Sequence, residues 1–253
     1  KPIYFCETAV PSVGQLSERD QAVMLVQKVA FAWSRGAIGY NWYILRNRGT
    51  DPNDPEQNFG LLRHDFSPKP AYAAYQTLIR TLRGKTYRKQ YDIGRDRYAL
   101  LFGDAERTVL VLWRQPSVGS DEQLLFQTAA DRIERIDMMS NAAPADRFED
   151  RLVATLTCEP TYYVMNSPDA PTWIAQPLRR DQPVVAFSDQ PVDVAITARN
   201  PSKLEREMRL EWTVPPGLRR VSAPDAIQMA AGQESEIRAR FLVSEPLRSG
   251  ETV

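Results

Sequence analysis

The chain has 253 residues, of which 43% are hydrophobic, and its 32 lysines and arginines balance its 32 aspartates and glutamates. This length allows one large domain or two to three small ones with real cores, and the balanced charge argues against a nucleic-acid partner or a basic membrane patch. No apolar run approaches the roughly 20 residues that a membrane helix needs, so no membrane span is expected.

Metal, disulfide and cofactor chemistry are not indicated by the side chains present. Cys6 and Cys158 lie far apart in the sequence, so we expect two buried thiols rather than a disulfide framework or a zinc site. His64 is the one histidine, and without a second one or a convincing partner we expect it to be structural. No cofactor is expected.

The first segment, residues 1–84, predicts the order strand, helix, strand, helix. Residues 2–6 form an apolar run typical of a parallel strand covered on both faces, and "AIGYNWYIL", residues 37–45, reads as a second buried strand. Two βα units cannot make a domain, because two parallel strands leave both sheet edges open. We therefore expect missing neighbours before Lys1 and interpret the chain, which starts without Met, as a fragment of a longer one.

Sequence signals mark the ends of both helices. Ser17 with Asp20 predicts a capping box at the start of the first helix, and Gly36 predicts its end. Pro70 is a favourable first residue of the second helix, and Gly84 predicts its end. The apolar faces are expected to be formed by Ala22, Val23, Val26, Val29, Ala30 and Trp33 in the first helix, and by Tyr72, Tyr75, Leu78, Ile79 and Leu82 in the second.

Two further segments predict antiparallel β-structure. Residues 85–166 contain short alternating runs typical of a β-sandwich, namely "YALLF", "TVLVLW", "QLLFQTA", "RIERIDMM", "RLVATLT" and "TYYVM". A Pro-rich linker follows, and residues 167–253 predict a second, immunoglobulin-like sandwich from "VDVAITARN", "EMRLEWTV", "AIQMAAG" and "SEIRARFLV". We expect this last sandwich to be cut short. The predicted fold class is therefore multidomain, α/β followed by all-β.

Reactive groups in a βα-repeat domain gather at the C-terminal ends of the parallel strands. Glu7 has this position in the first strand and Trp42 in the second, so we expect both to open onto one face. A carboxylate beside an aromatic ring is what a sugar site needs, since the carboxylate can attack an anomeric carbon and the ring can pack on a pyranose.

These residues resemble a known family. "KPIYFCE", "GAIGYNWYIL" and "NFGLLRHDFSPKPAYAAYQTLIRTLRG" look like the last two βα units of a (β/α)8 TIM-barrel glycoside hydrolase, from the clan whose catalytic glutamates lie on strands four and seven. "YALLFGDAERTVLVLWR" is similar to the β-sandwich often appended to such enzymes, and "DVAITARNPSKLEREMRLEWTVPPGLRR" resembles an associated immunoglobulin-like sandwich.

The resemblance implies roles for two residues. Glu7 would be the nucleophile of a retaining mechanism on a carbohydrate substrate, and Trp42 would form the floor of the subsite for the cleaved sugar. The acid/base glutamate would lie upstream of Lys1, so the isolated fragment is expected to be inactive. The substrate class favours a secreted or periplasmic location, and the oligomeric state stays open.

Other interpretations also fit the sequence. Glu7 also fits a salt-bridged strand-end carboxylate, Trp42 a core residue, and the loop carboxylates Asp51, Asp54 and Glu56 a solvated face. The main alternative is a non-catalytic protein of the same architecture that binds glycan or another protein. A Rossmann-like enzyme is disfavoured, because neither βα turn carries a Gly-rich phosphate loop.

Overall fold

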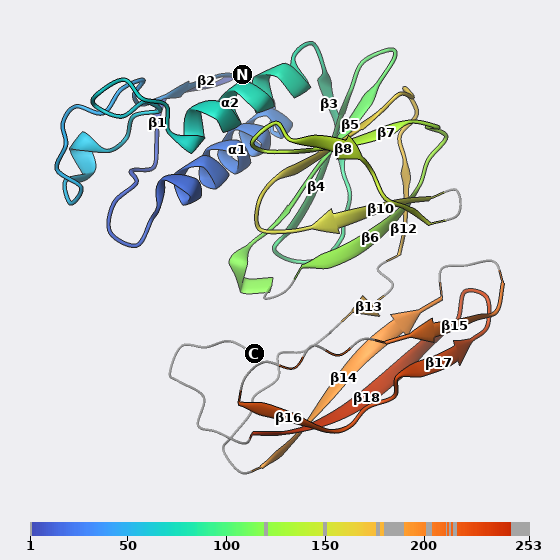
Figure 1. Cartoon of the computed structure of the whole chain (residues 1–253). Coiled ribbons are helices and arrows are strands. Elements are labelled where there is room, and N and C mark those ends of the chain that lie inside the picture. The colour runs from blue at the N-terminus through green and yellow to red at the C-terminus, as the bar shows by residue number, and fades with distance from the viewer. Residues whose placement is uncertain are drawn as a thin grey trace. The chain divides into compact units, whose positions relative to one another are not determined.

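The computed structural model forms two compact units, one of residues 1–121 and 127–172 and the other of residues 122–126 and 173–253. Its described part is mixed α/β, mostly β-sheet, with two α-helices (Figure 1). The described residues are 2–118, 121–148, 151–175, 178–179, 190–200, 204–210, 212, 214 and 217–243.

Both helices begin and end where the sequence predicts. Helix α1 spans Glu18–Ser34 and has the capping box of Ser17 and Asp20. Helix α2 spans Pro70–Leu82 and carries Pro in its first turn. Gly36 and Gly84 follow the two helices with φ angles of 82° and 75°, a left-handed backbone that glycine adopts without steric cost.

The buried face of α2 differs from the predicted one. Tyr72 and Ile79 are exposed by 42% and 44%, although both were expected in the core. The buried face of the helix instead contains small side chains such as Ala71 and Ala74, and small side chains allow a helix to lie close to its neighbours. The buried residues of α2 are Ala71, Ala74, Thr77, Leu78 and Leu82.

Strands β1 (Ile3–Thr8) and β2 (Ala37–Trp42) form a two-stranded parallel sheet. The parallel pairing agrees with the βα interpretation, but the expected burial of both strands is wrong for the described chain. Ile38 is 69% exposed and the Cys6 thiol is exposed as well. The cause is topological, because no other described strand pairs with either edge of this sheet. The second strand also ends at Trp42, three residues earlier than expected.

A six-stranded antiparallel sheet has the order β3-β4-β5-β11-β7-β8. Strands β3 and β8 were not predicted, because neither sequence has an apolar alternation. The bounds are Thr86–Gln90 for β3, Arg97–Gly103 for β4, Thr108–Arg114 for β5, Thr161–Met165 for β11, Ile133–Asp137 for β7 and Ala142–Pro144 for β8.

A second sheet has the order β12-β6-β10-β9. Strand β12 lies within the segment that was expected to be a linker. The bounds are Thr172–Ala175 for β12, Glu122–Gln127 for β6, Arg151–Leu156 for β10 and Arg147–Phe148 for β9. Two single 3-10 turns, Pro55–Gln57 and Pro116–Val118, complete the first part of the chain.

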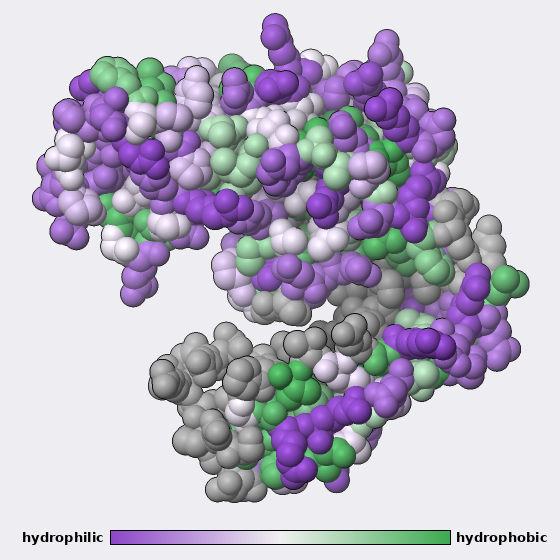
Figure 2. All heavy atoms as spheres, in the orientation of Figure 1, coloured by the Kyte–Doolittle hydropathy of each residue, from purple (hydrophilic) through white to green (hydrophobic). Residues whose placement is uncertain are grey.

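One hydrophobic cluster joins the helices to the six-stranded sheet. Leu25 and Val26 of α1 and Leu78 of α2 belong to the same buried cluster as Phe102 of β4 and Trp113 of β5. Figure 1 shows both helices between the β1-β2 pair and this sheet. Hydrophilic side chains cover most of the visible surface of this unit, with smaller hydrophobic patches between them (Figure 2). The helices are therefore anchored on the six-stranded sheet and carry β1 and β2 on their other side.

The second unit contains a sheet of order β13-β14-β18-β16 and a separate β15-β17 pair. Ala198, Met229 and Ile237 form one buried hydrophobic cluster in it. The immunoglobulin-like topology stays a prediction. The bounds are Leu178–Arg179 for β13, Pro191–Arg199 for β14, Glu234–Val243 for β18, Leu218–Ser222 for β16, Arg206–Arg209 for β15 and Ala226–Met229 for β17.

Candidate active site

Glu7 is the penultimate residue of β1 and is exposed. Its strand partner is parallel, so the C-terminal ends of β1 and β2 lie side by side, as they do at the mouth of a βα-repeat domain. No hydrogen bond or ion pair holds the Glu7 carboxylate within the described chain. The group is thus available to a ligand rather than committed to a structural pair.

The strand is irregular just where Glu7 lies. Phe5 pairs with Tyr40 and Thr8 pairs with Trp42, so three steps along β1 match two steps along β2. The extra residue makes a bulge around Cys6 and Glu7. Bulges interrupt the simple alternation of side chains and often redirect a side chain beside an active site. The direction of the Glu7 side chain could therefore not be deduced from alternation in the sequence.

Trp42 is the last residue of β2 and pairs with Thr8 of β1. Its indole Nε1 donates a hydrogen bond to the Phe59 carbonyl oxygen at 3.0 Å, and its ring is half-buried against the cluster that contains α1 and α2. The indole therefore ties the end of β2 to the loop before α2. Its N–H is already used, so a ligand at this strand end would meet the ring rather than this donor.

Tyr4 lies across the neighbouring strand. Its hydroxyl donates to Asn41 Oδ1 at 3.1 Å, and its register partner is Gly39. A Cβ atom at Gly39 would come within 2.2 Å of Tyr4 Cε2, so the missing side chain leaves room for the phenol ring. Tyr4 thus connects β1 and β2 by a side-chain contact as well as by backbone pairing.

A buried lysine joins the loops that follow the two strands. Lys69 is 1% exposed, and its Nζ donates at 3.0 Å to both the Asn58 carbonyl oxygen and Ser12 Oγ. Ser12 belongs to the loop after β1, and Asn58 belongs to the long loop after β2. One ammonium group therefore fixes both loops that border the candidate site.

Burial lowers the pKa of Lys69 to about 8, which the Glu18 carboxylate only partly counteracts. Its direct partners are uncharged oxygens, so no counter-ion compensates for the lost hydration. Three oxygen acceptors surround the ammonium group, the third being Gln21 Oε1 at 3.5 Å.

Gln21 extends this polar network into α1. Its side chain is fully buried, and Nε2 donates to the Val10 carbonyl oxygen at 2.8 Å and to the carbonyl oxygens of Asn58 and Phe59 at 3.3 Å. The loop after Glu7 is therefore held by both Gln21 and Lys69. A buried network whose members are all paired is a rigid support.

The long loop after β2 is internally braced by two asparagines. Asn47 Oδ1 accepts the Gly60 backbone N–H at 2.9 Å, and Asn47 Nδ2 donates to Asn58 Oδ1 at 3.2 Å. Of the three loop carboxylates, Asp51 and Asp54 accept backbone N–H groups within their own turns at 2.9 Å. This agrees with the interpretation of these carboxylates as a solvated face.

The buried network of Lys69 and Gln21 was not predicted, although the sequence around both residues contains indications of it. Lys69 stands between two prolines at the position before a helix, and its side chain makes no cap. Gln21 lies four residues before Leu25 on the buried face of α1, where a polar side chain needs a partner. Among the described residues, no group of three or more potential metal ligands occurs.

An apolar groove of about 430 Å³ is lined by β2 and the two helices. Both helices contribute to it, with Trp33 from α1 and Tyr75 and Ile79 from α2. Burial raises the pKa of Tyr75 and of Tyr40, which also lines the groove. The complete lining is Val29, Trp33, Ala37, Ile38, Gly39, Tyr40, Tyr75, Leu78 and Ile79.

Comparison with solved structures connects this arrangement to carbohydrate-active enzymes. A family 39 glycoside hydrolase from the gut symbiont Bacteroides cellulosilyticus WH2 matches 65% of this chain with 29% sequence identity and a TM-score of 0.59. A family 30 subfamily 8 xylanase from Clostridium acetobutylicum matches 66% of it with 13% identity and a TM-score of 0.50. The described fold is glycoside-hydrolase-like.

The chain spans only part of each of these proteins. It covers 34% of the family 39 enzyme and 43% of the family 30 enzyme. No protein-family model and no curated protein matches the sequence. Within the described residues, no helix is both long and apolar enough to cross a membrane.

Proposed function

We propose that this chain supplies the nucleophile of a retaining glycoside hydrolase. The observation that carries the proposal is the position of Glu7 at the C-terminal end of a parallel strand, at a bulge and one residue before Thr8, which pairs with Trp42. The Glu7 carboxylate is exposed and has no partner among the described residues. The likeness to a family 39 glycoside hydrolase at 29% identity supports it. A salt-bridged strand-end carboxylate, the structural alternative, would have a cationic partner, and Glu7 has none within the described chain.

The proposed reaction is a double displacement. A Glu7 carboxylate oxygen attacks the anomeric carbon while the leaving-group oxygen takes a proton from a second carboxylic acid, which gives a covalent glycosyl-enzyme and a free alcohol. That acid, now a base, takes a proton from water, which attacks the same carbon and releases Glu7. The two carboxyl groups would be about 5 to 5.5 Å apart.

We place the second acid outside these 253 residues, in a barrel of which β1, α1, β2 and α2 are two βα units. Ile3, Tyr4 and Phe5 of β1 and Ile38 of β2 are large and exposed, and the apolar groove along β2 has no described strand beside it. Further βα units would cover these surfaces and close the sheet edges. The chain alone is accordingly proposed to be inactive.

Chemical rescue of a Glu7 variant in the complete protein tests the proposal. Glu7→Gly should remove hydrolysis of an aryl glycoside, and sodium azide should restore cleavage by attacking the anomeric carbon from the vacated side. The product would be a glycosyl azide of configuration opposite to that of the substrate. Activity near wild type in Glu7→Gly would remove Glu7 from the mechanism, whereas absence of hydrolysis in the wild-type protein itself would favour the non-catalytic, glycan-binding alternative.

A further inference from the structure

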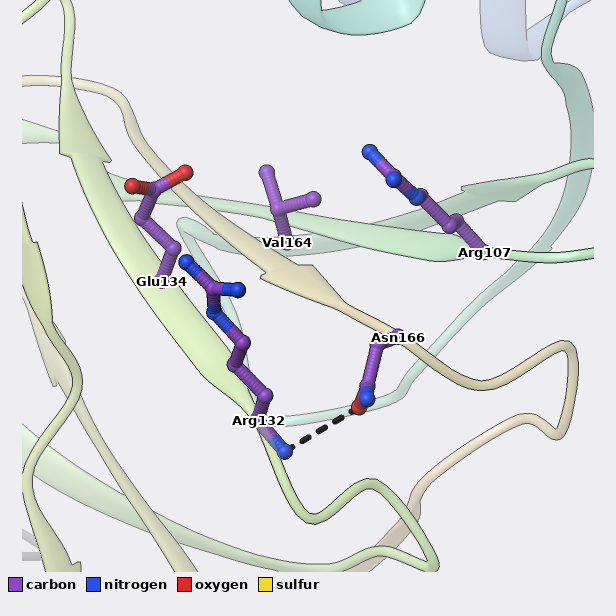
Figure 3. A pocket seen from close by; sticks show the side chains of 5 residues that line it. All are labelled: Arg107, Arg132, Glu134, Val164 and Asn166. Atoms are coloured by element: carbon purple, nitrogen blue, oxygen red, sulfur yellow. Dashed lines mark hydrogen bonds between the residues drawn. The ribbon is translucent and has the colours of Figure 1, made fainter.

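A polar groove of about 360 Å³ lies on the six-stranded sheet, away from the ends of β1 and β2. It is lined by one residue each of β7 and β11 and by residues that directly flank β5, β7 and β11: Arg107, Arg132, Glu134, Val164 and Asn166. Figure 3 shows Arg107 and Arg132 extending over the sheet on either side of Val164. The groove therefore has an apolar floor between two cations.

The strand register brings these residues together. Val164 pairs directly with Glu134, and Met165 pairs with Thr108 on one side and Ile133 on the other. One residue further, the same register aligns Asn166 with Arg107 and Arg132. Since neighbouring strands lie about 4.8 Å apart, the backbones that carry the two arginines are about 10 Å apart. A single sugar ring would fill the space between their side chains.

The two guanidinium groups are free, whereas the neighbouring amide is not. Asn166 Oδ1 accepts the Arg132 backbone N–H at 3.1 Å, and Asn166 Nδ2 donates to Asp131 Oδ1 at 2.6 Å. In the described part of the chain, neither the Arg107 nor the Arg132 guanidinium forms a hydrogen bond or an ion pair, and Glu134 forms none either. The groove thus offers two unused cationic donors and one unused acceptor.

This set of groups fits an acidic sugar better than a neutral one. A guanidinium group donates two parallel hydrogen bonds to a carboxylate or sulfate, and such charged pairs are the strong ones. The Glu134 carboxylate would accept from ring hydroxyls, and Val164 would contact a C–H face. A volume of about 360 Å³ is near the lower end of the range of ligand pockets, which suits one monosaccharide unit.

We propose that this groove is an accessory binding site for a sugar residue that carries an oxyanion, either a carboxylate or a sulfate ester. The saccharide nature of the ligand rests on the proposed function, whereas the anion preference rests on the two free arginines. The site would hold an acidic sugar unit of a polysaccharide, in its backbone or in a branch, on the six-stranded sheet. Another part of the same polysaccharide would be processed elsewhere.

The test is an NMR titration of the protein with three methyl glycosides that share one ring: the glucuronide, the glucoside 6-sulfate and the neutral glucoside. We expect the Val164 methyl and Asn166 amide signals to shift with at least one acidic glycoside, at concentrations at least tenfold lower than with the neutral one. Equal binding of the neutral glucoside would overturn the anion preference. Equal binding of inorganic sulfate would overturn the sugar site.

Single substitutions test which side chains bind the acidic glycoside. Arg107→Gln and Arg132→Gln should each weaken binding of the acidic glycoside at least tenfold. Arg135→Gln is the matched control, because Arg135 is exposed and lies next to Glu134 on the opposite face of β7. Loss of binding in Arg135→Gln equal to that in Arg132→Gln would contradict the site. Glu7→Gln should bind the acidic glycoside as tightly as the wild type does. The result of this binding test therefore does not depend on the proposed role of Glu7 in catalysis.

Discussion

Thr8 of β1 pairs with Trp42 of β2 in the parallel register, and this pairing sets Glu7 beside the end of the second strand. The loops that follow these two strands are held by the buried side chains of Gln21 and Lys69, which donate to the carbonyl oxygens of Val10 and Asn58. An exposed carboxylate on a braced edge is the arrangement that a nucleophile requires, since attack depends on a fixed position.

Lys69 is expected to give the protein a distinct pH dependence of stability. Its folded-state pKa of about 8 lies below its ordinary value of 10.5, so the unfolded chain binds more protons between these pH values. The free energy of unfolding therefore rises with pH across this window, by up to about 3 kcal/mol from this group.

The measurement is urea unfolding of wild type and Lys69→Met at pH 7 and pH 10. The wild type should gain stability relative to Lys69→Met as the pH rises, while groups common to both proteins cancel. An identical pH dependence in the two proteins would show that Lys69 titrates normally in the folded state. Lys85→Met, which removes an ammonium paired with Asp104 at 2.8 Å, serves as a control for loss of a lysine.

Much of the architecture could be predicted from local patterns. The capping box at Ser17, the prolines and glycines at helix ends and the alternating runs of the sandwich are short-range signals, and the observed elements match them. Burial in β1 and β2 could not be predicted, because the exposure of Ile38 and Cys6 depends on which strands pair at the sheet edges. The groove at Arg107 and Arg132 likewise depends on register between distant strands.

Gly39→Ala should destabilise the first unit through Tyr4. The added Cβ would lie 2.2 Å from Tyr4 Cε2, so the phenol ring must move and its hydrogen bond to Asn41 is lost. We expect a loss of about 1 to 2 kcal/mol in the free energy of unfolding. In the Tyr4→Ala background the same substitution should be nearly neutral. A double-mutant cycle by chemical denaturation measures this coupling, and additive effects would contradict the contact.

Trp42→Phe separates two possible roles of the indole. The variant loses the hydrogen bond to the Phe59 carbonyl, so a fall of about 1 kcal/mol in unfolding free energy is expected. Under the proposed function the smaller ring also covers less of the sugar, so kcat/KM should fall about tenfold. Unchanged kcat/KM with reduced stability would leave Trp42 as a core residue only. Trp33→Phe, in the helix α1, is the control for a smaller aromatic ring away from the strand ends.

As the proposed nucleophile, Glu7 becomes covalently glycosylated during turnover, and this intermediate can be trapped in the complete protein. Aryl 2-deoxy-2-fluoroglycosides with a good leaving group slow hydrolysis of the intermediate, so the adduct accumulates and is located by peptide mass spectrometry. We predict one added fluoroglycosyl group on the peptide that contains Glu7, and none in Glu7→Gln. A label on another carboxylate would show that Glu7 is not the nucleophile, and turnover with inversion at the anomeric carbon would contradict the double displacement.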